Sequence, residues 1–260
     1  MSRKKFVTLS LLFACIWGLM PTCATRSHLS KNSSTPENTD EPKTKLEKHS
    51  SEINALTYFR GEGVNLSTYL ADLNKEPEVY KNAEEFLNSR SMDILLKIAK
   101  KQIENNPKFE NLHETEIAAL RMYTSGFHFS LNIALRNPDD PQSLNKFEAI
   151  SKVLASAINK KDDLSFRGKV YRYIGADDKL LKSFVKGGIY TDKGFMSCTT
   201  QRGLLSRPVE LIIEATRAKY IASFSEIRTE EEVIISAGNS FEILDVEKDE
   251  TLTRVYLKQL

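Results

Sequence analysis

The sequence predicts an α+β protein in which N-terminal helices pack on a mainly antiparallel β core. Two observations favour this fold class. Between residues 78 and 160, apolar residues recur at intervals of three and four, which is the period of amphipathic helices. After Lys161 the chain changes to short apolar or alternating runs separated by turns, as strands do. Because the two patterns follow one another rather than alternate, an antiparallel sheet is expected.

The helical half contains five amphipathic segments. We predict Ser91 and Ser143 as N-caps and breaks at Pro107, Gly126 and Pro138. The predicted helices span residues 78–88, 91–104, 114–123, 129–136 and 143–160.

The second half contains the strand-like runs, one short helix at 177–186, and turns at Gly187-Gly188 and Gly238-Asn239. The predicted strands span residues 169–174, 194–198, 209–213, 232–235, 241–246 and 253–257.

The first 24 residues have the organisation of a signal peptide. Residues 1–5 are basic, residues 6–20 are apolar, and small residues follow. The apolar run is short for a membrane span. We therefore expect a secreted protein that is cleaved after Ala24. A surface form that carries a lipid on Cys23 is the weaker alternative, because the residues before this cysteine match a lipidation motif poorly.

Residues 25–51 are rich in Ser, Thr, Asn, Lys, Glu and Pro and contain almost no large apolar residue. Such a segment cannot offset its ordering entropy by burial, so we predict a flexible linker. One domain follows at 52–260, with a helical part at 52–162 and a β-rich part at 163–260. The formal net charge of +2 gives no indication of a nucleic-acid-binding surface, and the cysteines form no disulfide framework.

Two acids, Glu230 and Glu232, stand one residue apart before the β-branched run at 233–235. In an extended chain, residues two apart lie on one side at about 6.6 Å, so both carboxylates would face the same space while Glu231 turns away. If both are ionised, they repel by about 2 kcal/mol at an effective dielectric constant near 20. A cationic ligand or transition state would relieve that repulsion, although such clusters are also common as solvated turns.

Two earlier runs carry further polar groups on predicted strands. Arg172 lies within an otherwise apolar and aromatic run, and Ser197 and Thr199 follow on the next strand. The plain structural alternatives are an ion pair for Arg172 and a backbone-bonded hydroxyl for Ser197. Cys198 is more typical of a small buried filler than of a nucleophile, since no histidine lies nearby in the sequence.

In this order and spacing, the arginine, the hydroxyls and the acids resemble the signature of the arginine, serine and glutamate class of mono-ADP-ribosyltransferases. That class includes actin-modifying binary toxins, clostridial Rho-modifying exoenzymes and vertebrate ecto-enzymes. The resemblance covers roughly residues 114–260 and implies two packed, mainly antiparallel sheets with the co-substrate NAD between them.

The resemblance also implies a role for each residue of the set. Arg172 would hold NAD, Ser197 would orient Glu232 with Thr199 in support, and Glu232 would stabilise the ribosyl cation. Glu230 would select an arginine of an acceptor protein and activate it. These roles agree with elementary chemistry, because a guanidinium binds a pyrophosphate through forked hydrogen bonds. A carboxylate near the ribose stabilises charge that develops only in the transition state.

The chain departs from the family pattern at three places. Cys198 stands where relatives have the middle residue of Ser-Thr-Ser, and Ile227 stands where many have a substrate-recognising aromatic residue. Between the hydroxyl motif and Pro208, where some relatives cover the nicotinamide with a ring, this chain has Arg202 and Arg207. These differences bear on acceptor choice and NAD affinity.

No metal is expected. His28 and His49 lie in the linker, and His113 and His128 lack partners at metal-ligand spacing. Two other functions remain open: an NAD glycohydrolase, in which water replaces the acceptor, and a catalytically silent NAD- or protein-binding module of the same fold. We expect a monomer, and the sequence does not distinguish a bacterial toxin or effector from a eukaryotic ecto-enzyme.

Overall fold

The structure is a computed structural model that describes residues 77–260 except 138, 139, 176 and 226. The predicted signal peptide, the linker and the start of the predicted domain lie outside the described residues and stay predictions. The helices are α3 (Pro77–Ser89), α4 (Asp93–Asn105), η1 (Pro107–Phe109), α5 (Glu114–Met122), η2 (Tyr123–Phe127), α6 (His128–Arg136), α7 (Pro141–Asn159), α8 (Asp178–Ser183) and η3 (Arg228–Glu230). The strands are β1 (Ser165–Ile174), β2 (Ile189–Asp192), β3 (Met196–Thr199), β4 (Val209–Tyr220), β5 (Glu232–Ile235), β6 (Asn239–Lys248) and β7 (Thr253–Gln259).

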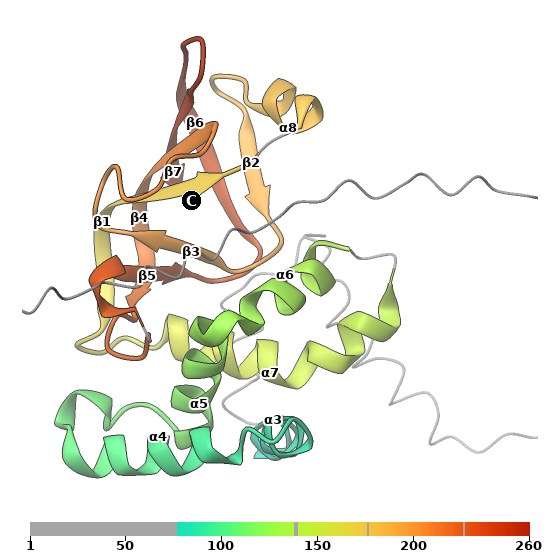
Figure 1. Cartoon of the computed structure of the whole chain (residues 1–260), viewed down its shortest axis with the longest axis vertical. Coiled ribbons are helices and arrows are strands. Elements are labelled where there is room, and N and C mark those ends of the chain that lie inside the picture. The colour runs from blue at the N-terminus through green and yellow to red at the C-terminus, as the bar shows by residue number, and fades with distance from the viewer. Residues whose placement is uncertain (1–76, 138–139, 176, 226) are drawn as a thin grey trace, which may run out of the picture. The chain divides into compact units, whose positions relative to one another are not determined.

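The predicted order of helices before strands is confirmed. Helices α3 to α7 lie together below the sheet in Figure 1, with α6 next to β3 and α8 near β2. The break expected at Gly126 is present as the π-turn η2, in which Gly126 takes a positive φ of 90°. This conformation favours glycine, and it lets α6 start in a new direction after α5.

Both predicted serine caps were wrong. Ser91 has a positive φ of 56° and precedes Met92, which caps α4 without a side-chain bond. Helix α7 begins before Ser143, because Asp140 accepts a hydrogen bond from the Ser143 backbone N–H and Pro141 occupies the first helical position. An aspartate followed by proline is a strong start signal, and it displaced the helix start by one turn.

The strands form one connected sheet in the order β1-β3-β5-β4-β7-β6-β2. The expected two sheets are thus joined, because the twelve-residue strand β4 pairs with β1, with β5 and with β7. All pairs are antiparallel except β4–β7. Strand β2 was not predicted. It has four residues at the sheet edge, where sequence patterning is weak.

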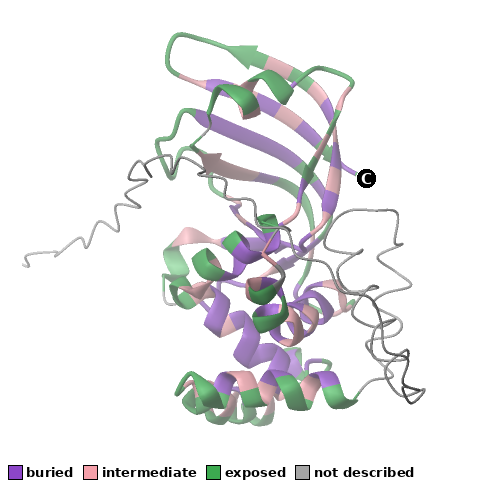
Figure 2. Ribbon diagram, turned by 90° about the vertical axis from the view of Figure 1, so that its right-hand side faces the viewer, coloured by how far each residue is buried: buried purple, intermediate pink, exposed green. Residues whose placement is uncertain are grey.

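Two hydrophobic cores fill the part of the chain that the structure describes, and β5 lies between them. Ile234 packs in the core shared with the helices, whereas Val233 and Ile235 pack in the core of the sheet. Alternate side chains of a strand point to opposite faces, so β5 is buried on both. Figure 2 shows the buried residues along the strands and in the central helices. The uninterrupted apolar run of β5 is a consequence of this position.

Among the described residues, no helix combines the length and apolar character needed to cross a bilayer.

Candidate active site

Arg172 on β1 meets the strand that carries the hydroxyls. Its Nη1 donates a hydrogen bond of 2.7 Å to the backbone oxygen of Ser197, and its buried Nε–H has no hydrogen-bond partner. No acid in the described chain forms an ion pair with it, so the structure does not have the ion pair that was the plain alternative. Burial lowers the pKa of Arg172, but the surrounding negative charges, Asp192 foremost, raise it overall.

Ser197 connects this arginine to Glu232. Its Oγ donates a hydrogen bond of 2.5 Å to the Glu232 Oε1. The register explains the contact: Ser197 lies opposite Ile234 on β5 and Thr199 lies opposite Glu232, so Ser197 and Glu232 are diagonal neighbours on one face. The serine hydroxyl is therefore bonded to an acid rather than to the backbone.

Glu232 is buried, with 7% of its surface exposed. Burial raises the pKa of its carboxyl group, the negative charge of Glu230 raises it further, and hydrogen bonds from Ser197 and Ser225 oppose the shift. A carboxylate that is desolvated yet held by two hydroxyls is positioned to act on a nearby positive charge. The contact of Ser225 with Glu232 was not predicted from the sequence.

The extended geometry predicted for the two acids was wrong. Glu230 ends the 3₁₀ turn η3, and Glu231 takes a left-handed φ of 48° before β5 begins at Glu232. The negative charge of Glu230 nevertheless contributes to the raised pKa of Glu232. The Thr199 Oγ1 donates to the backbone oxygen of Glu230 at 2.7 Å. Glu231 turns to Tyr220, whose hydroxyl donates to its carboxylate.

Helix α6 holds the start of β3 in place. The Asn132 side chain donates to the backbone oxygen of Phe195 at 3.1 Å and accepts from its N–H at 2.8 Å. Tyr123 also donates to that oxygen at 3.2 Å. Tyr123 and Asn132 thus hold the residue that directly precedes β3, two positions ahead of Ser197.

Asp192 was missed by the sequence reading. Arg136 donates to both of its carboxylate oxygens, at 2.8 and 3.0 Å, and the Gly194 N–H donates to one of them at 2.9 Å. The Tyr190 hydroxyl donates to the second oxygen at 3.3 Å. An acid at the end of an unpredicted edge strand carries no sequence signal for such a role, because its partner lies 56 residues earlier.

Two other residues near Arg172 have shifted pKa values. Burial lowers the pKa of His128, and the positive charges of Arg172 and Arg136 lower it further. Burial raises the pKa of Cys198 to about 12, so its thiol stays protonated at neutral pH and agrees with a filler role. In the part of the chain that the structure describes, no group of three His, Cys, Asp or Glu residues is placed to hold a metal ion.

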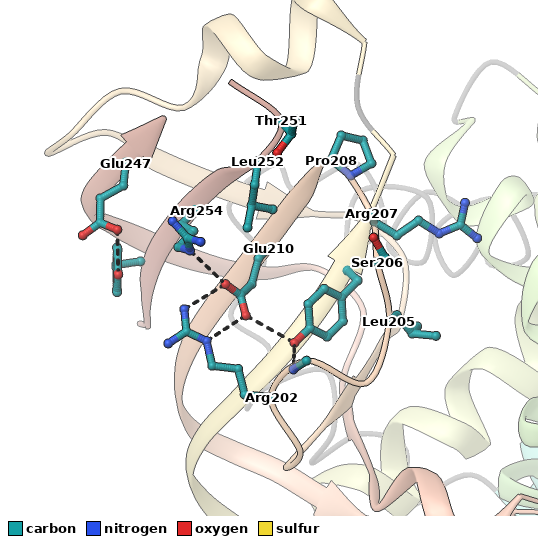
Figure 3. Close-up of a pocket in the computed structure, with 13 residues that line it drawn as sticks. Arg202, Leu205, Ser206, Arg207, Pro208, Glu210, Glu247, Thr251, Leu252 and Arg254 are labelled. Carbon is teal, nitrogen blue, oxygen red and sulfur yellow. Dashed lines mark hydrogen bonds and ion pairs between the residues drawn. The ribbon is translucent and has the colours of Figure 1, made fainter. Parts of the chain in front are cut away.

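An open cavity of about 970 Å³ lies away from these residues, and none of Arg172, Ser197 and Glu232 lines it. It contains Tyr173, which follows Arg172 on β1 and points to the other face of the strand. Figure 3 shows Glu210 in this cavity with hydrogen bonds from Arg202 and Tyr173 and an ion pair to Arg254. Arg202 is one of the residues at which the chain departs from the family pattern. It binds the carboxylate of Glu210 in this cavity, away from Arg172, Ser197 and Glu232.

Residues 95–260 match the family described as ADP-ribosyltransferase exoenzyme. The chain belongs to this family. The comparison with curated proteins finds no match.

The fold of these ADP-ribosyltransferases is found in solved structures of bacterial effectors. The type III effector XopAI from Xanthomonas axonopodis pv. citri is 17% identical, with a TM-score of 0.64 over 84% of this chain and 100% of that chain. Exoenzyme S from Pseudomonas aeruginosa, solved with human 14-3-3 protein beta and carba-NAD, is 18% identical, with a TM-score of 0.54 over 69% and 88%. HopU1 of Pseudomonas syringae pv. tomato, an ADP-ribosyltransferase, is 18% identical, with a TM-score of 0.50 over 81% and 97%.

At these identities the structural likeness establishes the fold and confirms the predicted fold class, and the family match confirms the predicted family. Membership of the ADP-ribosyltransferase exoenzyme family supports a transferase activity and is consistent with NAD as the donor.

Proposed function

We propose that this chain is an NAD-dependent mono-ADP-ribosyltransferase that modifies an arginine of an acceptor protein and releases nicotinamide. The observation that carries the proposal is the continuous contact from Arg172 through Ser197 to Glu232. These three residues lie on three different strands, and the resemblance assigns all of them to one reaction.

The donor capacity of Arg172 fits a pyrophosphate. A buried N–H without a partner costs free energy, so a ligand that accepts from it gains more than it would at an exposed site. Forked, charge-assisted hydrogen bonds to phosphate oxygens are the interaction that guanidinium makes best. We assign Arg172 to the NAD phosphates on this basis.

Glu232 would act on the ribose. Breaking the bond between nicotinamide and ribose leaves positive charge on the sugar, and a carboxylate fixed beside it stabilises charge that the ground state lacks. Ser197 holds that carboxylate in one orientation, so little reorganisation is needed when the charge develops. The carboxylate must be ionised for this role.

Glu230 would receive the acceptor arginine. Its side chain is partly exposed beside the buried Glu232, and Thr199 holds its backbone. In the family, a glutamate at this first acidic position accompanies arginine as acceptor, whereas glutamine accompanies asparagine. Glu230 would bond the guanidinium and help to remove its proton.

Replacing the acids one at a time tests this division of work. We expect Glu232→Gln to lower both nicotinamide release and transfer to protein by on the order of 10²-fold. Glu230→Gln should lower transfer while sparing nicotinamide release. Glu231→Gln is the matched control, because Glu231 bonds Tyr220 instead and should change neither activity strongly. Labelled NAD incubated with cell lysate measures transfer, and free nicotinamide measures cleavage.

The same assay separates the alternatives. Nicotinamide release without label on protein or on a free arginine ester would identify an NAD glycohydrolase. No nicotinamide release at high enzyme concentration would indicate a silent binding module. Equal loss of both activities in Glu230→Gln would contradict the role of Glu230.

We also infer that the protein is secreted. The support is the basic, apolar and small-residue order of residues 1–24. The N-terminal mass of the exported protein distinguishes cleavage after Ala24 from lipidation of Cys23. A chain that stays inside the cell with Met1 retained would overturn the inference.

A further inference from the structure

A second, smaller cavity lies on the helical side, next to the segment that carries the acids. It has about 420 Å³ and is lined by Ile98, Lys101, Gln102, Asn105, Asn106 and Phe109. The ring of Phe109 lies 5.0 Å from that of Phe224, in the segment between β4 and β5. Figure 1 shows this segment facing α4 and α5. Both rings are buried, so the helical surface that contains the cavity packs directly against the segment that leads to Glu230 and Glu232.

Three basic residues lie at the cavity or on the elements next to it, and we call Lys101, Arg121 and Arg228 the basic rim. Lys101 lines the cavity, and the Arg121 Nε donates to the Gln102 Oε1 at 2.8 Å, which places Arg121 beside it. Arg228 starts the turn η3 that ends at Glu230. The basic rim thus has members at the cavity and on the turn that carries the first acid.

The basic rim has no acidic partner within the described chain. Glu104 and Glu110, which stand next to cavity-lining residues in the sequence, are exposed, do not line the cavity, and make no ion pair with the rim. Burial and the like charge of Arg228 lower the pKa of Arg121. Two arginines that repel each other without compensation favour the approach of an anion.

We propose that the basic rim and its cavity bind an acidic segment of the acceptor protein beside the target arginine. This inference rests on the proposed function, because the arginine itself must reach Glu230. The charges are complementary at both points: Glu230 attracts the guanidinium, and the rim attracts neighbouring carboxylates. The amide side chains of Gln102, Asn105 and Asn106 line the cavity and supply further hydrogen-bond donors, and Phe109 is an apolar part of the lining.

A nucleic acid fits the surface less well. The rim contains only three cations and the formal net charge of the chain is +2, which is far from the extended basic surface that a phosphate backbone requires. Nucleic acid is therefore an outcome of the test and not part of the proposal.

Binding is measured first, since it does not depend on turnover. The probes are two fluorescent peptides with one central arginine, flanked by aspartates and glutamates in one and by glutamines in the other. We expect the acidic peptide to bind about tenfold more tightly at low salt, with the difference shrinking as salt is added. The double variant Lys101→Gln, Arg228→Gln should lose most of this preference. Both positions are exposed, so folding should be unaffected.

The matched control removes two exposed lysines elsewhere, in the double variant Lys248→Gln, Lys258→Gln. It changes the net charge equally and should keep the preference. Equal binding of the two peptides, or a preference that survives loss of the rim lysine and arginine, would overturn the proposal. So would tighter, rim-dependent binding of a short single-stranded RNA that displaces the acidic peptide.

An activity measurement separates this inference from the proposed function. The rim double variant should raise KM for the acidic peptide about tenfold at unchanged kcat, and should leave transfer to a free arginine ester unchanged. Suppose that no acceptor is modified but that the rim double variant still loses the preference for the acidic peptide. The arginine-transferase proposal then fails and the proposed binding surface stands. If transfer proceeds without regard to flanking charge, the inference about the rim fails and the activity stands.

Discussion

The carboxylate of Glu232 lies under two opposing influences. Its burial and the charge of Glu230 favour the protonated form, whereas the hydroxyls of Ser197 and Ser225 stabilise the charged form. The net effect raises its pKa. The ionised fraction therefore declines at a higher pH than for an exposed glutamate as the solution is acidified. Activity that needs the carboxylate should decline with it.

Ser197→Ala tests this balance. Loss of the hydroxyl removes a contribution that lowers the Glu232 pKa, so the pKa should rise further. We expect the acid limb of the pH profile of nicotinamide release to move to higher pH than in the unmodified protein. Ser183→Ala is the control, because that hydroxyl bonds the Leu180 backbone on α8. An acid limb that stays in place or moves to lower pH would refute this account of Ser197.

At the same scale, the sequence predicted which residues meet but not how they meet. Arg172, Ser197 and Glu232 were expected in one pocket, and they form one series of contacts. The bond from Arg172 goes to a backbone oxygen, which no side-chain motif specifies. Asp192 escaped prediction because its bonds to Arg136 depend on two segments that are distant in the chain.

Among the secondary structure elements, the junction of α6 with β3 determines where the hydroxyl strand begins. Asn132 bonds both backbone groups of Phe195, and Gly194 comes close enough to α6 to leave no room for a side chain. A Cβ at Gly194 would lie 2.7 Å from the Asn132 Oδ1 and 2.9 Å from the Arg136 Cζ. Gly194 is needed because the backbone there approaches α6 too closely to leave space for a side chain.

Gly194→Ala should therefore loosen this junction. We expect a loss of about 1–3 kcal/mol in the free energy of unfolding, typical of overpacking, measured by urea denaturation. Gly175→Ala is the matched control, since no atom lies within 4 Å of its added Cβ and its stability should hardly change. Equal stability of the two variants would show that the contact with α6 can relax freely.

The elements themselves were largely predictable. Helices and central strands of regular hydrophobic period were found at or near their predicted positions, because burial of one face imposes that period. The sequence did not predict four features: the caps of α4 and α7, the edge strand β2 and the turn at η3. Each depends on local backbone geometry or on a partner strand, and neither leaves a periodic signal.

For the molecule as a whole, a buried ion pair connects the end of the helical part to the sheet. Lys219 on β4 donates to Asp162 at 2.6 Å and to the backbone oxygen of Lys160 at 3.0 Å. Their side chains are 0% and 1% exposed. Burial lowers the pKa of Lys219, and Asp162 opposes that shift. Without its acid, this lysine would be an uncompensated buried charge.

Asp162→Asn should accordingly destabilise the whole domain. We expect a loss of about 3–5 kcal/mol in the free energy of unfolding, with partial recovery when Lys219→Met is added. Asp245→Asn is the control, because its pair with Lys186 is exposed and its loss should have little effect. Denaturant unfolding of the three variants measures the difference. A small effect of Asp162→Asn, or no recovery in the double variant, would contradict this role.

The sequence by itself determined the order of helices and strands, the family, and the set of residues expected to react, because these depend on local period and on motifs along the chain. The tertiary structure alone decided the joining of the sheets through β4, the contact of Arg172 with the Ser197 backbone, and the turn that separates Glu230 from Glu232. It also brought Arg121 beside the cavity that Lys101 lines. These features arise from strand register and from packing between distant segments, which stabilise the fold only after the chain has closed on itself.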